Sequence, residues 1–194
     1  MPPFLEVLTR TFGKRPRMFA INQSSLWAQT DSDWIQTILM DAEARGINFA
    51  TEQMAAYADR LVGEYIFCLD DDDMLICPTL VADLKCLAAE FDPDVIMLRM
   101  DHGGGVVLPD DDTWGQPPVL GRIGCSAFVV RRAVWAAHAG AMVPGHYASD
   151  YDFIRSIWDA APRVYWHNCV ASRVMKQSFG QPEVASPWAK QGVS

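Results

Sequence analysis

The feature that most constrains the fold is a regular alternation of strand-like and helix-like stretches through residues 4–100. An apolar stretch at 4–10 precedes a stretch at 16–29 whose apolar residues recur near helical spacing, and a second apolar run follows at 34–40. A strand, a helix and a strand in this order form a βαβ unit, whose two strands lie parallel. The sequence therefore predicts an α/β fold, Rossmann-like, with a mostly parallel sheet flanked by helices.

The alternation continues beyond this first unit. The next predicted elements are a helix over 52–62 capped by Thr51 and ended by Gly63, a strand over 64–69, a helix that opens at Pro78, and a strand over 94–100. A stretch rich in Gly, Pro and Asp follows at 102–118, and this composition favours turns and exposed loop. We expect this loop to divide the sheet into a larger lobe and a smaller one.

The second half of the chain carries weaker patterns. It is predicted to contain a strand over 126–130, a short helix from Arg131, a loop at Pro144 and Gly145, a helix from Ser149 and a strand over 163–166. At 194 residues the chain is expected to form one domain. Its predicted parts are a first half at about 1–100, a second half at about 101–178, and a loosely ordered tail at 179–194.

Charge and composition exclude some classes of protein. The chain has 16 Lys and Arg against 24 Asp and Glu, and this net charge of −8 disfavours a polyanionic partner held by bulk electrostatics. Lys14, Arg15 and Arg17 still form a local basic cluster near the start. No stretch has the length of an uninterrupted apolar membrane span, and no signal-peptide pattern is visible, so we expect a cytoplasmic protein. The five cysteines form no CxxC pair and are interpreted as reduced core residues.

The most informative motif is a run of four aspartates, Asp70 to Asp73, directly after the strand predicted at 64–69. Four adjacent carboxylates repel one another, and a divalent cation such as Mn²⁺ or Mg²⁺ is the natural compensator. Ligands of open α/β sheets also gather at the carboxyl ends of the strands. A solvated acidic loop is the alternative for such a run, whereas an EF-hand is disfavoured because Leu75 stands where its glycine is required.

Two further residues are candidates for chemistry. Ser149 is predicted to cap a helix that has Asp150 in its first turn. Asp150 is then either an ordinary acid stabilised by the helix end or a general base that accepts a proton from a hydroxyl. His167 follows the apolar stretch at 163–166, and it is either a hydrogen-bonded structural residue or a metal ligand beside Asp72.

With these motifs in view, the chain resembles the family 2 glycosyltransferases of GT-A fold over about residues 4–175. Tyr65 to Asp73 is similar to that family's strand and Asp-x-Asp motif, with Asp70 and Asp72 as the two motif acids. Ser149 and Asp150 are similar to the family's acidic motif, although Ser149 replaces the usual glutamate. The segment from Arg122 to Ser126 resembles the one that shapes the acceptor site. Compared with larger relatives, the chain looks like a small member that contains only the core.

The resemblance implies that the half at about 1–100 binds the nucleotide-sugar and that the half at about 101–178 binds the acceptor and carries catalysis. It also implies a role for each matching residue. Asp72 is implied to bind the metal with His167 near it, and Asp150 is implied to be the catalytic base. The residues implied to bind the nucleotide-sugar donor are Thr9 and Asp41 at the base, Asp70 near the ribose, and Arg10 and Asp71 beside them.

These implications together describe an inverting, metal-dependent glycosyltransferase of hexosyltransferase type. Its donor is expected to be a nucleotide-diphosphate sugar, most naturally a UDP-sugar, and its acceptor a hydroxyl of a glycan, a lipid-linked glycan, a protein or a modified nucleobase. One alternative is a nucleotidyltransferase, but the loop at 9–14 has one glycine where that class usually has a glycine-rich loop. The other alternative is a nucleotide-sugar-binding module without catalysis.

Overall fold

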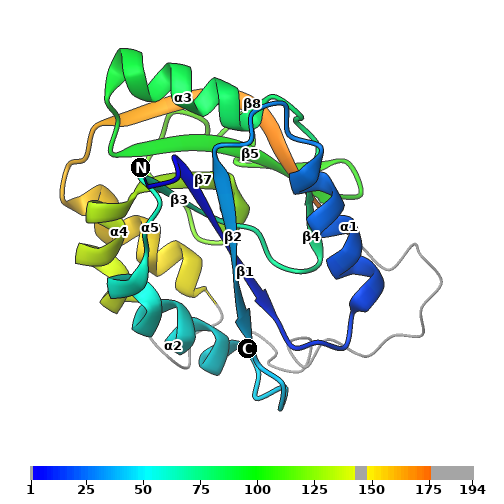
Figure 1. Cartoon of the computed structure of the whole chain (residues 1–194). Helices are drawn as coiled ribbons and strands as arrows, with labels where there is room; N and C mark the ends of the chain where they lie inside the picture. The colour runs from blue at the N-terminus through cyan, green and yellow to red at the C-terminus, as the bar shows by residue number, and fades with distance from the viewer. Residues whose placement is uncertain (1, 143–147, 176–194) are drawn as a thin grey trace.

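The computed structural model describes residues 2–142 and 148–175, which form one eight-stranded sheet with helices on both faces (Figure 1). The strands are β1 (Leu5–Thr11), β2 (Trp34–Met40), β3 (Tyr65–Cys68), β4 (Asp73–Leu75), β5 (Val95–Gly103), β6 (Val106–Leu108), β7 (Phe128–Arg131) and β8 (Val164–Val174). Their order is β2-β1-β3-β7-β5-β8-β4, with β6 paired to β5. Strands β1, β2, β3, β5 and β8 run in one direction and the other three run against them. The prediction of an α/β fold with a mostly parallel sheet is confirmed.

The helices form the two outer layers. They are α1 (Pro16–Trp27), α2 (Ile47–Tyr57), α3 (Leu80–Phe91), α4 (Arg132–His138) and α5 (Ser149–Asp159). Leu26 of α1 and Leu84 of α3 belong to the core on one face, whereas Met54 of α2, Trp135 of α4 and Phe153 of α5 belong to the core on the other. Figure 1 shows the same division. Within the described residues, no helix combines the length and the apolar character that crossing a membrane requires.

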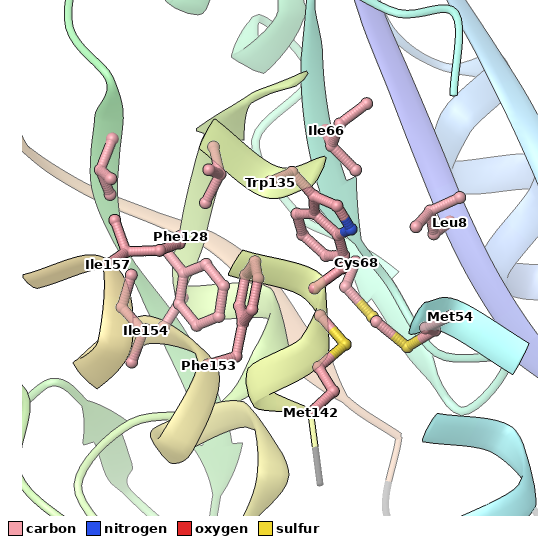
Figure 2. Packing of buried hydrophobic residues seen from close by; sticks show 14 of the residues in the cluster. Leu8, Met54, Ile66, Cys68, Phe128, Trp135, Met142, Phe153, Ile154 and Ile157 are labelled. Carbon is pink, nitrogen blue, oxygen red and sulfur yellow. The ribbon is translucent and has the colours of Figure 1, made fainter. Parts of the chain in front are cut away.

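The central position of β3 in the sheet explains why its sequence is apolar without interruption. Tyr65 and Phe67 point into the core beneath α1 and α3, while Ile66 and Cys68 point into the core beneath α2, α4 and α5. All four are buried, because a central strand covered on both faces has no solvent side. In the second core the ring of Trp135 packs on Phe153 with centroids 4.6 Å apart (Figure 2).

Several element boundaries differ from the prediction. Helix α2 begins at Ile47 after Gly46, so Thr51 is not its cap; the hydroxyl of Thr51 donates to the carbonyl of Ile47 at 2.8 Å. Helix α3 begins at Leu80, so Pro78 precedes the helix and does not open it. The N-cap of α5 is Ala148, and the predicted capping role of Ser149 is wrong.

The second half of the chain contains more regular secondary structure than its composition indicated. Residues 102–118 include β6, and they do not interrupt the sheet because β7 lies between β3 and β5. Strand β8 runs to Val174, well beyond the stretch predicted at 163–166. The loop predicted at Pro144 and Gly145 and the tail predicted at 179–194 lie outside the described residues.

Gly63 is required by packing and does not end a helix. A Cβ at this position would lie 2.5 Å from the Cβ of Glu6 and 2.7 Å from its backbone nitrogen. The amide of Gly63 also donates to Glu6 Oε2 at 2.9 Å, and the amide of Val62 donates to the same oxygen at 2.7 Å. The buried carboxylate of Glu6 therefore fixes the start of β3 against β1, and it needs glycine at the contact.

We predict that Gly63→Ala lowers the free energy of unfolding by about 1–3 kcal/mol, because the added methyl group must displace the backbone of β1. Gly140→Ala is the matched control: nothing lies within 4 Å of a Cβ at Gly140. Urea denaturation followed by circular dichroism measures both variants. Equal stability of the two would contradict the packing role of Gly63.

Candidate functional site

The residues singled out in the sequence meet at one edge of the sheet. Strand β1 is parallel to both β2 and β3, with Thr11 opposite Met40 and Leu8 opposite Cys68. The carboxyl ends of these three strands therefore lie together. Arg10 lies at the end of β1, Asp41 directly follows β2, and Asp70 to Asp73 follow β3.

A buried asparagine on α1 holds the acidic run in place. Asn22 donates from Nδ2 to the carbonyl oxygens of Asp70 at 2.9 Å and Asp73 at 3.0 Å. Its own Oδ1 accepts from Gln36 Nε2 at 2.8 Å, and Gln36 also donates to Thr9 Oγ1 at 2.8 Å. The hydroxyl of Thr9 is thus buried in a network that supports the acidic turn. Sequence reasoning missed Asn22; its only signal was an amide among the apolar positions of α1.

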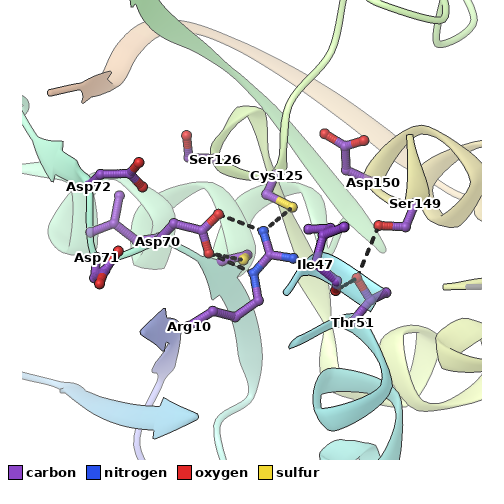
Figure 3. A network of polar contacts seen from close by, with 12 residues as sticks. Arg10, Ile47, Thr51, Asp70, Asp71, Asp72, Cys125, Ser126, Ser149 and Asp150 are labelled. Carbon is purple, nitrogen blue, oxygen red and sulfur yellow. Dashed lines mark hydrogen bonds and ion pairs between the residues drawn. The ribbon is translucent and has the colours of Figure 1, made fainter. Parts of the chain in front are cut away.

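Asp70, the first aspartate of the run, forms a bidentate ion pair with Arg10 (Figure 3). Arg10 Nε is 2.7 Å from Asp70 Oδ1 and Arg10 Nη2 is 2.5 Å from Asp70 Oδ2. Burial acts to lower the pKa of Arg10, but the charge and hydrogen bond of Asp70 together with the neighbouring Cys125 and Cys68 outweigh it, so the pKa lies well above its ordinary value. Arg10 and Asp70 therefore form a fixed charge pair in the floor of the site.

The next two aspartates share one arginine. Arg15 Nη2 is 2.5 Å from Asp71 Oδ1, and Arg15 Nη1 pairs with Asp72 Oδ2. Asp71 also accepts from Thr11 Oγ1 at 2.6 Å. Burial raises the pKa of Asp71 to about 6 and raises that of Asp72 as well, even though Arg15 acts in the opposite direction.

Asp150 approaches the same space from the other half of the chain. It lies in the first turn of α5, and its Oδ1 accepts from the amide of Tyr151 at 2.8 Å. Burial raises the pKa of Asp150, while the amide of Tyr151 and the charge of Arg10 lower it. Arg10, Cys125 and Asp150 line a cavity that is partly open to solvent. In Figure 3, Arg10 lies between Asp70 and Asp150.

The neighbours of Asp150 come from the segment expected to shape an acceptor site. A Cβ at Gly124 would lie 4.0 Å from Asp150 Oδ2 and 2.6 Å from the sulfur of Met100, so the chain passes close to the carboxylate here. Ser149 is buried and lies 3.5 Å from Thr51, oxygen to oxygen. Ser149 thus connects α5 to α2, and Thr51, Ser149 and Asp150 all line the cavity.

Two other predicted site residues lie directly after β2 and within β8. The carboxylate of Asp41 is buried and accepts from the amides of Arg45 at 2.5 Å and Gly46 at 3.3 Å. His167 lies within β8, seven positions before Val174, and it is Val174 that pairs with Asp73. Strand β8 is irregular in this stretch, because Trp166 lies opposite Met97 whereas Ser172 lies opposite Met100. Within the described residues, no group of three or more candidate metal ligands forms, so a metal-ligand role of His167 beside Asp72 stays a prediction.

Comparison with solved structures identifies the fold. S. aureus TarS 1-349 in complex with UDP-GlcNAc matches with a TM-score of 0.69 and 15% identity, over 98% of this chain and 62% of that chain. The mannosyltransferase PcManGT from Pyrobaculum calidifontis, in complex with GDP-Man and Mn²⁺, matches with a TM-score of 0.63 and 14% identity, over 93% and 59%. No protein-family model and no curated protein matches the chain. The fold is a GT-A-like glycosyltransferase fold, and this chain spans about three fifths of the length of those two proteins.

We predict that Arg10→Gln lowers the free energy of unfolding by about 2–4 kcal/mol, because the partly buried Asp70 loses the cation that makes two hydrogen bonds to it. The double variant Arg10→Gln/Asp70→Asn should recover part of this loss, since no unpaired charge remains. Arg163→Gln is the control, because Arg163 pairs with Asp92 and Asp94 on the surface. Chemical denaturation measures all three; a loss in Arg10→Gln no larger than in the control would contradict the assignment.

Proposed function

We propose that the chain is a metal-dependent glycosyltransferase, similar to family 2, that transfers a hexose from a nucleotide-diphosphate sugar to an acceptor hydroxyl with inversion. One observation carries this proposal: the acidic run after β3 and the carboxylate of Asp150 face the same space across Arg10. The two structural neighbours were solved with UDP-GlcNAc and with GDP-Man and Mn²⁺, which supports a nucleotide-sugar as the donor. A UDP-sugar is the first candidate.

The donor would lie over the carboxyl ends of β1, β2 and β3. Arg10 and Asp70 supply a rigid, charged floor beside the ribose, and Asp71 lies directly next to them. The base would lie toward Asp41 at the end of β2. Thr9 contributes from below, because its hydroxyl is part of the buried network through Gln36 that holds the acidic turn.

The residues present fit a hard divalent cation, Mn²⁺ or Mg²⁺, held by Asp72 with Asp71 behind it. Asp71 Oδ1 is buried, and Arg15 Nη2 lies 2.5 Å from it without forming an aligned hydrogen bond, so this oxygen retains acceptor capacity. No group of three or more candidate ligand side chains converges among the residues that the structure describes. Such cations are commonly held by one or two carboxylates together with the phosphates of a substrate. When bound, the cation supplies neutralising charge to the leaving nucleotide diphosphate.

Asp150 is the residue that we propose as the general base. Its carboxylate lies at the cavity and would accept the proton of the acceptor hydroxyl as that oxygen attacks the sugar. Because burial raises the pKa of Asp150, its carboxylate is a stronger base than an exposed aspartate. Arg10 carries a fixed positive charge nearby, which keeps the ionised form accessible.

The two alternatives are less well supported by the site. A nucleotidyltransferase needs a loop that cradles a triphosphate, but the turn after β1 is occupied by Arg15 bound to the acidic run. A binding module without catalysis would have no use for a second, half-buried carboxylate opposite the acidic run. The acceptor would be recognised around Gly124 and Cys125, next to Asp150.

We predict that Asp150→Asn lowers kcat for sugar transfer by about two to four powers of ten, because the amide cannot accept the proton. Its affinity for UDP should stay at the wild-type value, since Asp150 does not belong to the donor edge. Asp159→Asn is the matched control: it removes the same charge from the far end of α5, where Asp159 pairs with Arg155. Steady-state kinetics and UDP titration measure both; full activity in Asp150→Asn would exclude the base assignment.

A further inference from the structure

Arg15 connects the start of α1 to the acidic run. Its backbone is fixed: Arg15 is the N-cap residue of α1, Pro16 follows at the first helical position, and the carbonyl of Arg15 accepts from the amide of Phe19 at 3.0 Å. Its side chain reaches across to Asp71 and Asp72. A fixed backbone with a long side chain allows the guanidinium to change partners without any change of fold.

The contacts of Arg15 are less complete than those of Arg10. Arg10 makes two aligned hydrogen bonds to one carboxylate, and its side chain is 9% exposed. Arg15 is 23% exposed and divides its guanidinium between two carboxylates. Within the described residues, Arg15 Nε and Asp71 Oδ1 are buried without an aligned hydrogen bond. One face of the guanidinium rests on the ring of Phe12, 4.8 Å from its centroid.

Arg15 occupies the carboxylates that the proposed function assigns to the cation. Its nitrogens contact Asp71 Oδ1 and Asp72 Oδ2, so an incoming divalent ion meets a positive charge on the same oxygens. Two cations on one pair of carboxylates repel each other. Arg15 must therefore leave these oxygens when the cation binds there.

In a complex with the proposed donor, the diphosphate would lie close to the guanidinium that Arg15 has released. The first turn of α1 contains no acidic residue and its end has no side-chain cap, so its backbone amides add positive potential beside Arg15. A diphosphate offers the planar oxygen pairs that arginine binds with two hydrogen bonds. We propose that Arg15 is a switch residue: it neutralises Asp71 and Asp72 in the free chain and binds the diphosphate of the donor in the loaded chain. This inference rests on the proposed function.

The test measures two affinities in Arg15→Gln. Without Arg15 the carboxylates are uncovered, so we expect Mn²⁺ alone to bind about tenfold more tightly than in the wild type. UDP at saturating Mn²⁺ should bind at least tenfold more weakly, because a charge-assisted contact to phosphate is lost. Arg17→Gln is the matched control, since Arg17 is an exposed arginine in the first turn of the same helix. Both its affinities should equal those of the wild type.

Mn²⁺ binding is followed by electron paramagnetic resonance of the free ion, and UDP binding by calorimetry. An unchanged or weaker affinity of Arg15→Gln for Mn²⁺ alone would contradict the proposed switch role of Arg15, whatever the affinity for UDP. Tighter Mn²⁺ binding with unchanged UDP binding would overturn the contact to the diphosphate. If wild-type protein fails to bind UDP with any divalent cation, the proposed function fails instead, and the Mn²⁺ comparison still tests whether Arg15 covers the carboxylates. Arg15→Lys, which keeps the charge, should restore part of the UDP affinity.

Discussion

The rest of the site depends on how the protein accommodates four adjacent carboxylates at the end of a buried strand. Two arginines, Arg10 and Arg15, supply the positive charge, and Asn22 holds the backbone of the turn through the carbonyls of Asp70 and Asp73. Burial still raises the pKa of Asp71, Asp72 and Asp73, so the compensation is incomplete. Because the arginines do not fully neutralise these carboxylates, this edge of the sheet is suited to bind a divalent cation, or a ligand that brings a divalent cation with it.

The fold places the proposed binding site at this edge because helices cover the sheet on both faces. Helices α1 and α3 protect one face, and α2, α4 and α5 protect the other, while the carboxyl ends of β1, β2 and β3 lie together at one edge between these two layers. Helix α5 completes the arrangement by placing Asp150 opposite the acidic run. The donor and acceptor sides of the proposed reaction thus come from different halves of one sheet, with the Arg10–Asp70 pair between them.

The sequence predicted most of the fold but less of the site. Strand β2 lies at the predicted 34–40, and the βαβ unit is present. These predictions succeeded because the spacing of apolar residues within each stretch is enough to identify a strand or a helix. Gly63 was misread as a helix stop because its constraint, the contact with Glu6, joins residues far apart in the chain. Asn22 and the pairing of Arg15 with the acidic run were missed for the same reason. The place of His167 could not be predicted because β8 continues to Val174 with an irregular register against β5, which no local pattern reveals.

The central claim is that the acidic edge binds a nucleotide diphosphate through a divalent cation at Asp72. Calorimetric titration of UDP and UDP-sugars into wild-type protein and Asp72→Ala, with Mn²⁺ and with a chelator, tests it most directly. The account predicts binding by the wild type with Mn²⁺, and loss of that binding both with chelator and in Asp72→Ala. Binding of equal strength in all four combinations, or no binding of any nucleotide, would contradict it and would favour a solvated acidic loop.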